Sequence, residues 1–541
     1  MDFQRFFLVL IFSFSAFLLW DGWQRYQQPT PPVQTAIKHE ITAGTGLANI
    51  AKISPEIQNP NLSRQTNLQG KKIVVRTDNL LVEINTAGGD IQRVELLRHH
   101  DSEDKNKPFI LLNQEGGNTY IAQTGLLGQG LPTHQTLFFA NADEYHLSDG
   151  TDTVSVRLNT ADNAVSKILT FHRGSYLIDV TYEIENLNAT PLTASAYFQL
   201  VRDESIPVGA SKLVPTYTGP AIYTDQEKFQ KIEFSAIEKN KTSYPKTAES
   251  GWVAMLQHYF VSAWLPNGKT TREYYTKALE NKLFSIGAIV PVNTIAPGQK
   301  GSVSASLYVG PASAKLDDIA PGLGLTVDYG WLTIIATPLF WLLTFIQGWI
   351  HNWGAAIIVL TILIKLAFFP LSAASYRSMA KMRIVAPKLE KIKQQYSNDR
   401  EKLNKAMMDL YKTEKINPLG GCLPMLIQIP VFISLYWAIL SSVELRHAPF
   451  IGWINDLSAA DPYYVLPAIM GISMLIQGKL NPTPPDPLQA KLMQFMPVIF
   501  SVVFFFFPAG LVLYSVVNNI LSIAQQWYIT RAQETELKVA V

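Results

Sequence analysis

One lysine lies inside a long apolar segment and could bring a positive charge into a membrane. Lys365 falls within the run from Trp353 to Leu371, which is otherwise typical of a transmembrane helix. A lysine near the centre of a bilayer costs about 2.5–3.5 kcal/mol on insertion scales. The other predicted spans contain no Asp or Glu, so this cation requires water, a transient ligand or a side chain that extends to the cytoplasmic surface.

Other polar side chains recur in the apolar segments and could form hydrogen bonds there. Thr361 lies one helical turn before Lys365, so both side chains share a helix face. The further candidates are Gln428, Ser434, Ser473, Ser515, Asn518 and Ser522. Because such groups need partners or water in hydrocarbon, they predict a hydrated cavity with Lys365 on its wall. The alternative is a set of interhelical hydrogen bonds, which are common in helix bundles.

A basic, methionine-rich segment at 376–420 is a second candidate site. It carries eleven Lys or Arg residues against five Asp or Glu, and its apolar residues recur at helical spacing, which predicts a helical hairpin. The predicted docking residues are Met379, Lys381, Met382, Arg383, Lys388, Lys391, Met407 and Met408. Methionine adapts to varied apolar partners, so this face could bind hydrophobic segments. The alternative is that the methionines only pack the two helices together.

The sequence offers little that could support enzymatic chemistry. It has neither a His-Glu-x-x-His nor a Gly-x-Ser-x-Gly motif, and Cys422 is its single cysteine. Gly268-Lys269-Thr270 resembles the end of a P-loop, but Ala263 stands where the first glycine is needed. A net charge of +2 over 541 residues does not favour nucleic-acid binding. We therefore predict no enzymatic activity, no cofactor, no metal site and no direct nucleic-acid recognition.

The first half of the chain predicts an anchor, a linker and a β-domain. Residues 1–25 contain an apolar run without a small-residue cleavage site, which favours an uncleaved signal-anchor helix over a cleaved signal peptide. Residues 26–70 are rich in Pro, Gln, Thr and Asn, which is typical of a flexible linker. Residues 71–325 show short alternating strands broken by turn signals and predict a large β-sandwich.

The second half is strongly apolar and predicts an interfacial helix and five further spans. Residues 330–347 combine Trp and Phe with a proline, which favours an amphipathic helix in the membrane interface over a short span. The spans are predicted at 350–371, 421–440, 463–479, 492–507 and 511–527, with loops at 441–462 and 480–491. Each of the last two has about 16 residues, or roughly 24 Å of helix. Because a hydrocarbon core is about 30 Å thick, this pair should thin the bilayer.

Loop charges predict the orientation of the chain in the membrane. The basic segment 376–420 predicts a cytoplasmic location, whereas loop 441–462 has one Arg against three Asp or Glu and predicts the outside. The amino-terminus and the tail 528–541 are then cytoplasmic, and the β-domain is external. The predicted fold is a polytopic α-helical membrane protein with six transmembrane helices and a large extracytoplasmic all-β sandwich.

Six motifs occur together in the apolar half. They are Asn417–Pro424, Gln428–Pro430, Ser442–Arg446, Asp461–Tyr464, Phe495–Phe500 and Ser378–Arg383. Together they resemble YidC-type membrane protein insertases of the Gram-negative type with a large periplasmic domain, over about residues 1–530. The resemblance implies that the chain inserts and folds membrane proteins of the bacterial inner membrane without nucleotide hydrolysis, alone or with the Sec translocon. It also implies a core of five spans around a hydrophilic groove, open to cytoplasm and lipid and closed outside.

The resemblance assigns Lys365 to the basic position of the groove, with Thr361 beside it, and implies a groove contact for Tyr514. Many relatives have arginine in place of Lys365, and relatives can have a second tyrosine where this chain has Ser515. The implied partners are nascent membrane proteins, the Sec translocon and the lipid bilayer. A ribosome contact has weak support because the tail 528–541 is short and not basic.

Two other functions remain open from the residues. A secondary transporter would use the same cavity for a small solute, but such proteins usually need ionisable residues and inverted repeats. A membrane-anchored glycan-binding protein would use the β-sandwich, but that function leaves the polar spans and the basic hairpin unexplained.

Overall fold

The computed structural model describes residues 70–539 with short gaps. The gaps are 102–103, 105, 206, 208–216, 328, 330–331, 397–398, 415–422 and 482–486. The predicted signal anchor and nearly all of the predicted linker lie outside the described residues, as does most of the motif Asn417–Pro424. The chain forms two compact units, a β unit that ends at Val309 and a helical unit from Gly310 onward, with 256–261 grouped with the second.

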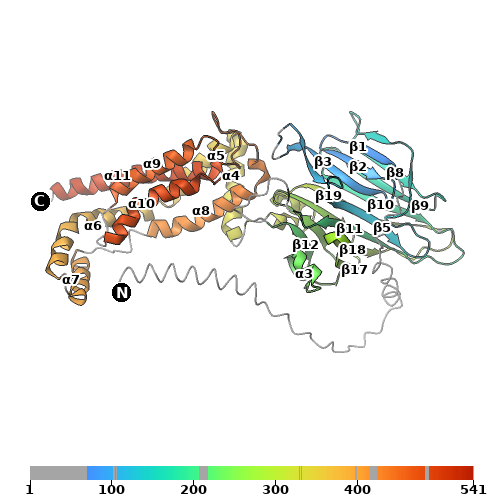
Figure 1. The fold of residues 1–541 in the computed structure, drawn as a ribbon, viewed down its shortest axis with the longest axis horizontal. Helices are drawn as coiled ribbons and strands as arrows, with labels where there is room; N and C mark the ends of the chain where they lie inside the picture. The colour runs from blue at the N-terminus through green and yellow to red at the C-terminus, as the bar shows by residue number, and fades with distance from the viewer. Residues whose placement is uncertain are drawn as a thin grey trace, which may run out of the picture. The chain divides into compact units, whose positions relative to one another are not determined.

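The β unit contains two large sheets (Figure 1). In order, the first consists of β14 (Thr247–Ala248), β17 (Arg272–Ala278), β18 (Leu283–Pro291), β11 (Ser195–Asp203), β5 (Tyr120–Leu127), β3 (Asp90–His100), β2 (Leu80–Asn85), β1 (Lys72–Arg76) and β7 (Glu144–His146), and β4 (Pro108–Leu112) also pairs with β3. The second consists of β13 (Lys228–Lys231), β12 (Gly219–Thr224), β15 (Trp252–Leu256), β16 (Phe260–Pro266), β19 (Lys300–Pro311), β10 (Leu177–Glu185), β9 (Val165–His172), β8 (Thr153–Asn159) and β6 (Phe139–Ala140). A short helix, α3 (Phe234–Glu238), and a 3-10 turn at Glu280–Lys282 complete the unit.

The sheets pack face to face because their strands carry alternating apolar side chains. In β9 and β10 every second residue is buried, as the period of a strand requires. The indole of Trp264 in β16 donates a 3.0 Å hydrogen bond to the carbonyl of Gln199 in β11, which links the two sheets. β5 and β11 are buried along both faces, and the ring of Tyr197 lies over the space that a side chain at Gly125 would fill.

Two buried charged residues of the β unit, Lys167 and Asp90, have hydrogen-bond partners within the unit. Lys167 in β9 is 2% exposed, and its ammonium donates to the carbonyls of Gly88 and Gly89 at 3.1 and 2.7 Å. Asp90 is also buried and accepts a 2.7 Å hydrogen bond from Gln123. Burial raises the pKa of Asp90 and lowers the pKa of Lys167, while the electrostatic attraction between the two opposes both shifts.

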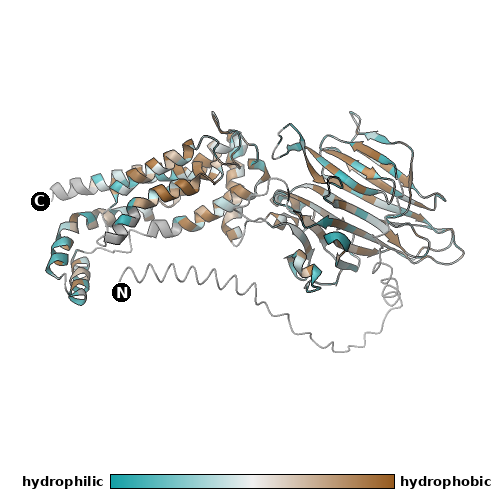
Figure 2. Cartoon of the chain, viewed as in Figure 1, coloured by the Kyte–Doolittle hydropathy of each residue, from teal (hydrophilic) through white to brown (hydrophobic). Residues whose placement is uncertain are grey.

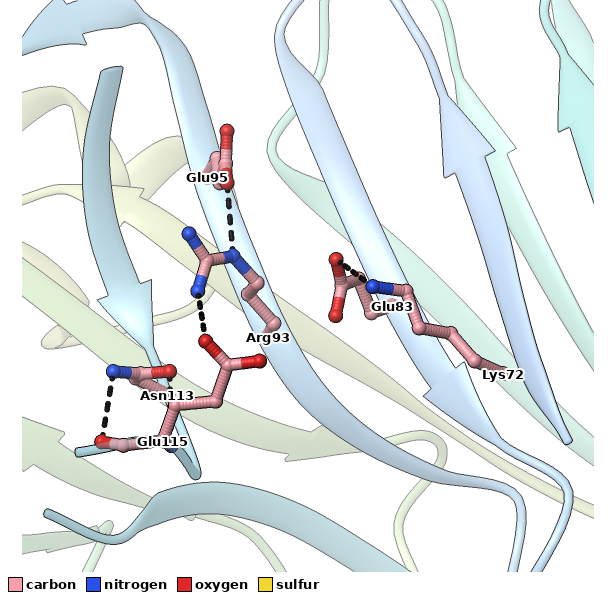
Figure 3. A network of polar contacts seen from close by, with 6 residues as sticks. All are labelled: Lys72, Glu83, Arg93, Glu95, Asn113 and Glu115. Carbon is pink, nitrogen blue, oxygen red and sulfur yellow. Dashed lines mark hydrogen bonds and ion pairs between the residues drawn. The ribbon is translucent and has the colours of Figure 1, made fainter. Parts of the chain in front are cut away.

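Ion pairs also form within and between strands of the first sheet (Figure 3). Arg93 in β3 lies between Glu95 at 2.8 Å and Glu115 at 3.2 Å. Lys72 in β1 pairs with Glu83 in β2 at 2.6 Å. Exposed pairs of this kind contribute little stability.

The helical unit is built from eight helices in the part of the chain that the structure describes. They are α4 (Thr333–Ile350), α5 (Trp353–Ala367), α6 (Phe369–Gln395), α7 (Arg400–Thr413), α8 (Leu423–Ser441), α9 (Val465–Leu480), α10 (Pro487–Phe504) and α11 (Ala509–Val539). Short 3-10 turns lie at Ala314–Asp318, Leu323–Thr326 and Val443–Leu445. α11 is central because it packs against α5, α6, α8 and α9. Its Leu511 and Val512 share one apolar core with Leu360 of α5 and Leu435 of α8.

The predicted span 350–371 is not one straight helix. α5 ends at Ala367, and α6 continues at an angle of 66°. Pro370 lies in the first turn of α6. Its ring provides no N–H and crowds the carbonyl of Leu366, so the helical hydrogen bonds cannot continue through this point. The basic hairpin therefore begins with α6 at Phe369, seven residues before the predicted boundary.

The last helix is also longer than predicted. The sequence predicts a span at 511–527 and a separate tail at 528–541, whereas α11 runs from Ala509 to Val539. Its 31 residues correspond to about 46 Å, which exceeds the roughly 30 Å of a hydrocarbon core. The predicted end at 527 follows the drop in hydropathy. The helical hydrogen bonds do not depend on hydropathy, so the helix continues beyond that residue.

Several helices of the helical unit are hydrophobic along much of their length (Figure 2), and some of their apolar side chains are exposed. On α9 and α10 the exposed apolar residues are Ile469, Ile472, Leu475, Ile476, Phe495, Met496, Val498, Ile499, Phe500, Val502 and Val503. An exposed apolar surface of this extent is typical of lipid contact. Among the described residues, α4 is the one straight helix of at least 18 residues that is apolar enough to cross a membrane, and the bent pair α5–α6 adds a second if it counts as one span. Helix length alone therefore does not establish six spans.

Candidate functional site

Lys365 and Ser522 meet at the seam between α5 and α11. The Lys365 ammonium donates a 2.6 Å hydrogen bond to the Ser522 hydroxyl, whose own proton goes to the carbonyl of Asn518 at 2.7 Å. Lys365 is half-buried. The sequences of α5, α8, α9 and α10 contain no Asp or Glu, and α11 has none before its last two turns. Among the described residues, the partner of this cation is thus neutral.

Two further polar contacts join helices near this seam. Gln428 in α8 donates a 2.6 Å hydrogen bond to the phenol of Tyr514 in α11. Asn519 in α11 donates a 2.7 Å hydrogen bond to the hydroxyl of Ser473 in α9. α11 therefore presents polar groups to three neighbours, α5, α8 and α9. Asn519 is not among the predicted site residues, although its amide within an apolar span is a signal of the same kind.

Three predicted hydroxyls are instead satisfied within their own helices. Thr361 donates to the carbonyl of Ile357 at 2.6 Å, Ser434 donates to Pro430 at 2.7 Å, and Ser515 donates to Leu511 at 2.8 Å. All three side chains are buried. Such bonds to the carbonyl four residues earlier are a common alternative for Ser and Thr in helices. The shared face of Thr361 and Lys365 therefore does not make the threonine hydroxyl available to a ligand.

Some polar atoms in the seam have unused hydrogen-bonding capacity. Within the described residues, the side-chain oxygens of Asn518 and Gln526 are buried and accept no hydrogen bond. The Gln526 amide donates to Leu480 and Asn481 at the end of α9. Because buried oxygens of this kind usually have a partner, they are positions where water or a substrate amide could bind. Sequence reasoning included Asn518 and missed Gln526.

The predicted docking residues lie on α6 and α7. Met379 packs against Ala373, Tyr376 and Ile529, so it belongs to the contact between α6 and α11. Met408 is 51% exposed, and Met382 and Met407 are half-buried. Lys381, Arg383 and Lys391 are exposed. Lys388 of α6 forms a 2.7 Å ion pair with Glu414, the residue that follows α7, and this pair links the end of α7 to α6. Packing against α11 thus accounts for Met379.

The loop between α8 and α9 is tightly folded over the ends of other helices. Asp461 accepts hydrogen bonds from the indole of Trp453 at 3.0 Å and from the backbone of Leu466 at 2.7 Å. The N–H groups of Ala509 and Gly510, at the start of α11, donate to carbonyls of this loop at 2.7 and 2.9 Å. These contacts hold the loop against the start of α9, the end of α10 and the start of α11.

Two family models together match nearly all of the described chain. Residues 72–342 match the YidC periplasmic domain, and residues 345–536 match the 60Kd inner membrane protein family. The membrane protein insertase YidC of Nitrosospira multiformis is 55% identical over 99% of this chain and 98% of its own length. The protein of the same name from Aromatoleum aromaticum is 54% identical over 99% of both chains.

A solved structure described as an active YidC insertase crystal structure with the first transmembrane domain resolved is also similar. It covers 88% of this chain and 99% of its own, with 19% identity and a TM-score of 0.40.

A β-sandwich joined to apolar helices with a polar seam is the architecture of a membrane protein with a large domain outside the bilayer. The chain belongs to the YidC family of membrane protein insertases, which are inner-membrane proteins with a periplasmic domain. This confirms the family predicted from the sequence motifs. The family is one of insertases and not of enzymes.

Proposed function

We propose that this chain inserts and folds integral inner-membrane proteins through the polar seam between α5, α8, α9 and α11. The seam forms a groove open to cytoplasm and lipid. The chain acts alone on short substrates and with the Sec translocon on larger ones. The ends of α10 and α11 close the groove outside, supported by the hydrogen bonds that hold the 441–462 loop there.

The main support for this function is the hydrogen bond between the Lys365 ammonium and the Ser522 hydroxyl. A single neutral hydroxyl holds the cation, and water or a substrate carbonyl or carboxylate can replace it. A charge in a low-dielectric environment attracts such groups more strongly than it would in bulk water. The groove thereby lowers the free energy of bringing a polar flank partway across the membrane. Partitioning of the adjoining hydrophobic segment into lipid supplies the driving force.

The hairpin α6–α7 is the proposed first contact. The hairpin carries exposed Lys381, Arg383 and Lys391 together with half-buried methionines, a combination suited to a nascent hydrophobic segment beside anionic lipid headgroups. A ribosome contact has weaker support, since residues 528–541 carry two basic and two acidic side chains.

The proposed topology has six spans with both termini cytoplasmic. A signal anchor at 1–25 and a linker at 26–70 precede the periplasmic domain at 71–325. Five spans at 350–371, 421–440, 463–479, 492–507 and 511–527 follow. We place α4 in the membrane interface, which its exposed Trp341 and Trp349 support, while its length and apolar composition would also allow it to cross the bilayer.

Reconstitution in liposomes tests the function directly. A short single-span substrate with an acidic flank is added, and protease protection of that flank is scored. We expect Lys365→Glu to abolish protection, because an anion in the groove repels the flank, and Lys365→Arg to retain it, because the charge remains. Wild-type protection with Lys365→Glu for every dependent substrate would contradict the electrostatic role of the groove.

A further inference from the structure

The loop between α8 and α9 turns its carboxylates toward the protein. In residues 447–464 the acidic side chains are Asp456 and Asp461. Asp456 is 14% exposed, accepts hydrogen bonds from the backbone and the hydroxyl of Ser458 at 2.9 and 2.7 Å, and lies 2.9 Å from Nδ1 of His447. Asp461 is 1% exposed and accepts hydrogen bonds of 2.7 to 3.0 Å from the loop and from α9. Both carboxylates therefore have partners within the protein.

The same loop turns large apolar and aromatic side chains outward. The exposed fractions are 68% for Ile451, 38% for Trp453 and 71% for Tyr463. The Trp453 indole and the Tyr463 backbone N–H bond to the same oxygen of Asp461, which makes these two residues neighbours. In a loop surrounded by water, charged groups are usually exposed and large apolar side chains are usually buried. The reversed arrangement here indicates a surrounding that is not purely aqueous.

A strained backbone conformation presents the tyrosines of this loop. Tyr464 has a φ of +57°, a left-handed conformation that is unfavourable for a bulky residue. The Asp461 carboxylate accepts hydrogen bonds from the N–H groups of Tyr463 and Leu466 on either side of it, and the Asp461 carbonyl accepts from Tyr464 itself at 3.1 Å. The Tyr464 side chain is nevertheless 51% exposed. Because strain of this kind is often retained at functional positions, we infer that the exposed tyrosines contact something outside the chain.

The outward side chains of the loop continue the apolar surface of α10. The ring of Tyr464 lies 5.1 Å from the ring of Phe505, which directly follows α10, and the next residue, Phe506, is 66% exposed. Val502 and Val503 in the last turn of α10 are also exposed and belong to the surface that is typical of lipid contact. The aromatic residues thus lie at one end of a lipid-facing surface. Trp and Tyr are enriched where such a surface meets the lipid headgroups.

We propose that these residues anchor the loop in the headgroup region of a phospholipid bilayer. The loop anchor consists of Ile451, Trp453, Tyr463, Tyr464 and Phe506. Ring faces and the isoleucine contact the upper acyl chains, and the tyrosine hydroxyls reach the headgroups. A soluble protein could not cover this patch and the adjoining face of α10 without entering the bilayer, which favours lipid as the partner. The inference goes beyond the proposed function and uses its topology only to name the leaflet, which is the periplasmic one.

Fluorescence quenching in the full-length protein tests where the loop lies. In a Cys422→Ser background, Ile451→Cys and Tyr463→Cys are each labelled with nitrobenzoxadiazole, and the protein is reconstituted alone in liposomes of phosphatidylethanolamine and phosphatidylglycerol. Brominated phospholipids quench a label that contacts acyl chains, whereas iodide quenches a label that contacts water. Leu187→Cys is the matched control, because Leu187 is an apolar side chain of the β unit with a similar exposed fraction, 63%. Phe506→Cys adds a site outside the loop in case a substitution disturbs the turn.

We expect the three labels of the loop anchor to be quenched by brominated phospholipids and the Leu187 label not to be. Bromine near the headgroups should quench more than bromine deep in the acyl chains, because the anchor lies at the interface. The iodide quenching constants at the anchor should be at least about threefold lower than at Leu187, as burial of the labels in the interface predicts.

Two results would overturn the inference. Iodide quenching as strong at the anchor as at Leu187 would mean that the loop lies in water. Labels shielded from iodide but insensitive to brominated phospholipids would mean that protein, such as a second copy of the chain, covers the patch. Neither readout requires insertion activity, so the result stands even if the proposed function fails. The side of the membrane from which iodide reaches the Leu187 label tests the topology separately.

Discussion

Two lysines show how differently the two units of this protein hold a positive charge. Lys167 in the β unit is almost fully buried, donates to two backbone carbonyls and interacts with the carboxyl group of Asp90. Lys365 in the helical unit is half-buried and donates to one serine hydroxyl. A cation with several fixed acceptors is part of the fold. A cation with one exchangeable partner keeps the capacity to bind a passing ligand, and the protein accepts a less stable arrangement there.

Replacement of the structural lysine should have the largest effect on stability. Lys167→Met should lower the free energy of unfolding of the β unit by about 3–5 kcal/mol, because Asp90 and two buried carbonyls lose their partner. Lys365→Met is the matched variant, and we expect it to change the stability of the helical unit by less than about 1 kcal/mol, since it removes a charge whose desolvation is unfavourable. Hydrogen exchange of β3, β9, α5 and α11 in the full-length protein measures both. Equal losses would remove the distinction between the two lysines.

The same contrast predicts a pH dependence that belongs to the β unit. Burial raises the pKa of Asp90 from 3.8 to about 7, against the opposing effects of Lys167 and Gln123. Between these values the folded state binds a proton that the unfolded state does not. The contribution of this carboxyl group to stability is therefore fully present below pH 3.8 and is lost as the pH rises through about 7.

Asp90→Asn tests this dependence because the amide has no charge at any pH. We expect the variant to flatten the change in β-unit stability between pH 4.5 and pH 7.5, measured by hydrogen exchange corrected for the intrinsic pH dependence. Asp104→Asn is the control, since the Asp104 side chain is 43% exposed and its pKa is lowered, not raised, by hydrogen bonds to its carboxylate. A slope that Asp90→Asn leaves unchanged would show that the buried pair titrates as it does in the unfolded chain.

A smaller effect is expected from the polar contacts between helices. Asn519→Leu removes the hydrogen bond to Ser473 and should lower the stability of the helical unit by about 0.6–1.7 kcal/mol, the range for such contacts in membrane helices. Ser473→Ala should cost a similar amount, and the double variant should cost less than the sum of the two. Thermal unfolding in detergent supplies the double-mutant cycle. Additive losses would mean that the two side chains do not act as a pair.

Sequence reasoning located the charge of the proposed groove and missed the bend that follows it. Lys365 is evident because one cation interrupts an apolar run. The bend is not, because the residues on both sides of Pro370 are apolar and the sequence therefore predicts one continuous span across the break between α5 and α6. Similarly, alternating residues predict the strands of the β unit, but the order of β11 between β5 and β18 depends on pairings of residues far apart in the chain.

For Thr361, the role predicted from the sequence differs from the hydrogen bond that its hydroxyl forms in the structure. Spacing places the threonine on the lysine face, and the family resemblance implies a groove role, yet its hydroxyl donates to the carbonyl of Ile357 within its own helix. Thr361→Val keeps the shape of the side chain and removes only the hydroxyl. Because that hydroxyl is already satisfied, we expect the insertion rate of a single-span substrate to change by less than about twofold.

Two further variants, Ser434→Ala and Ser522→Ala, are compared with Thr361→Val. Ser434→Ala removes another hydroxyl that bonds within its own helix and should behave like Thr361→Val. Ser522→Ala removes the hydroxyl that holds Lys365 and should reduce the rate several-fold more than either. If Thr361→Val instead reduces insertion as much as Ser522→Ala does, the threonine must rotate toward the substrate during insertion. Its bond to Ile357 would then describe only the resting state, and a hydroxyl that donates within its own helix, as Thr361 does, could take part in insertion.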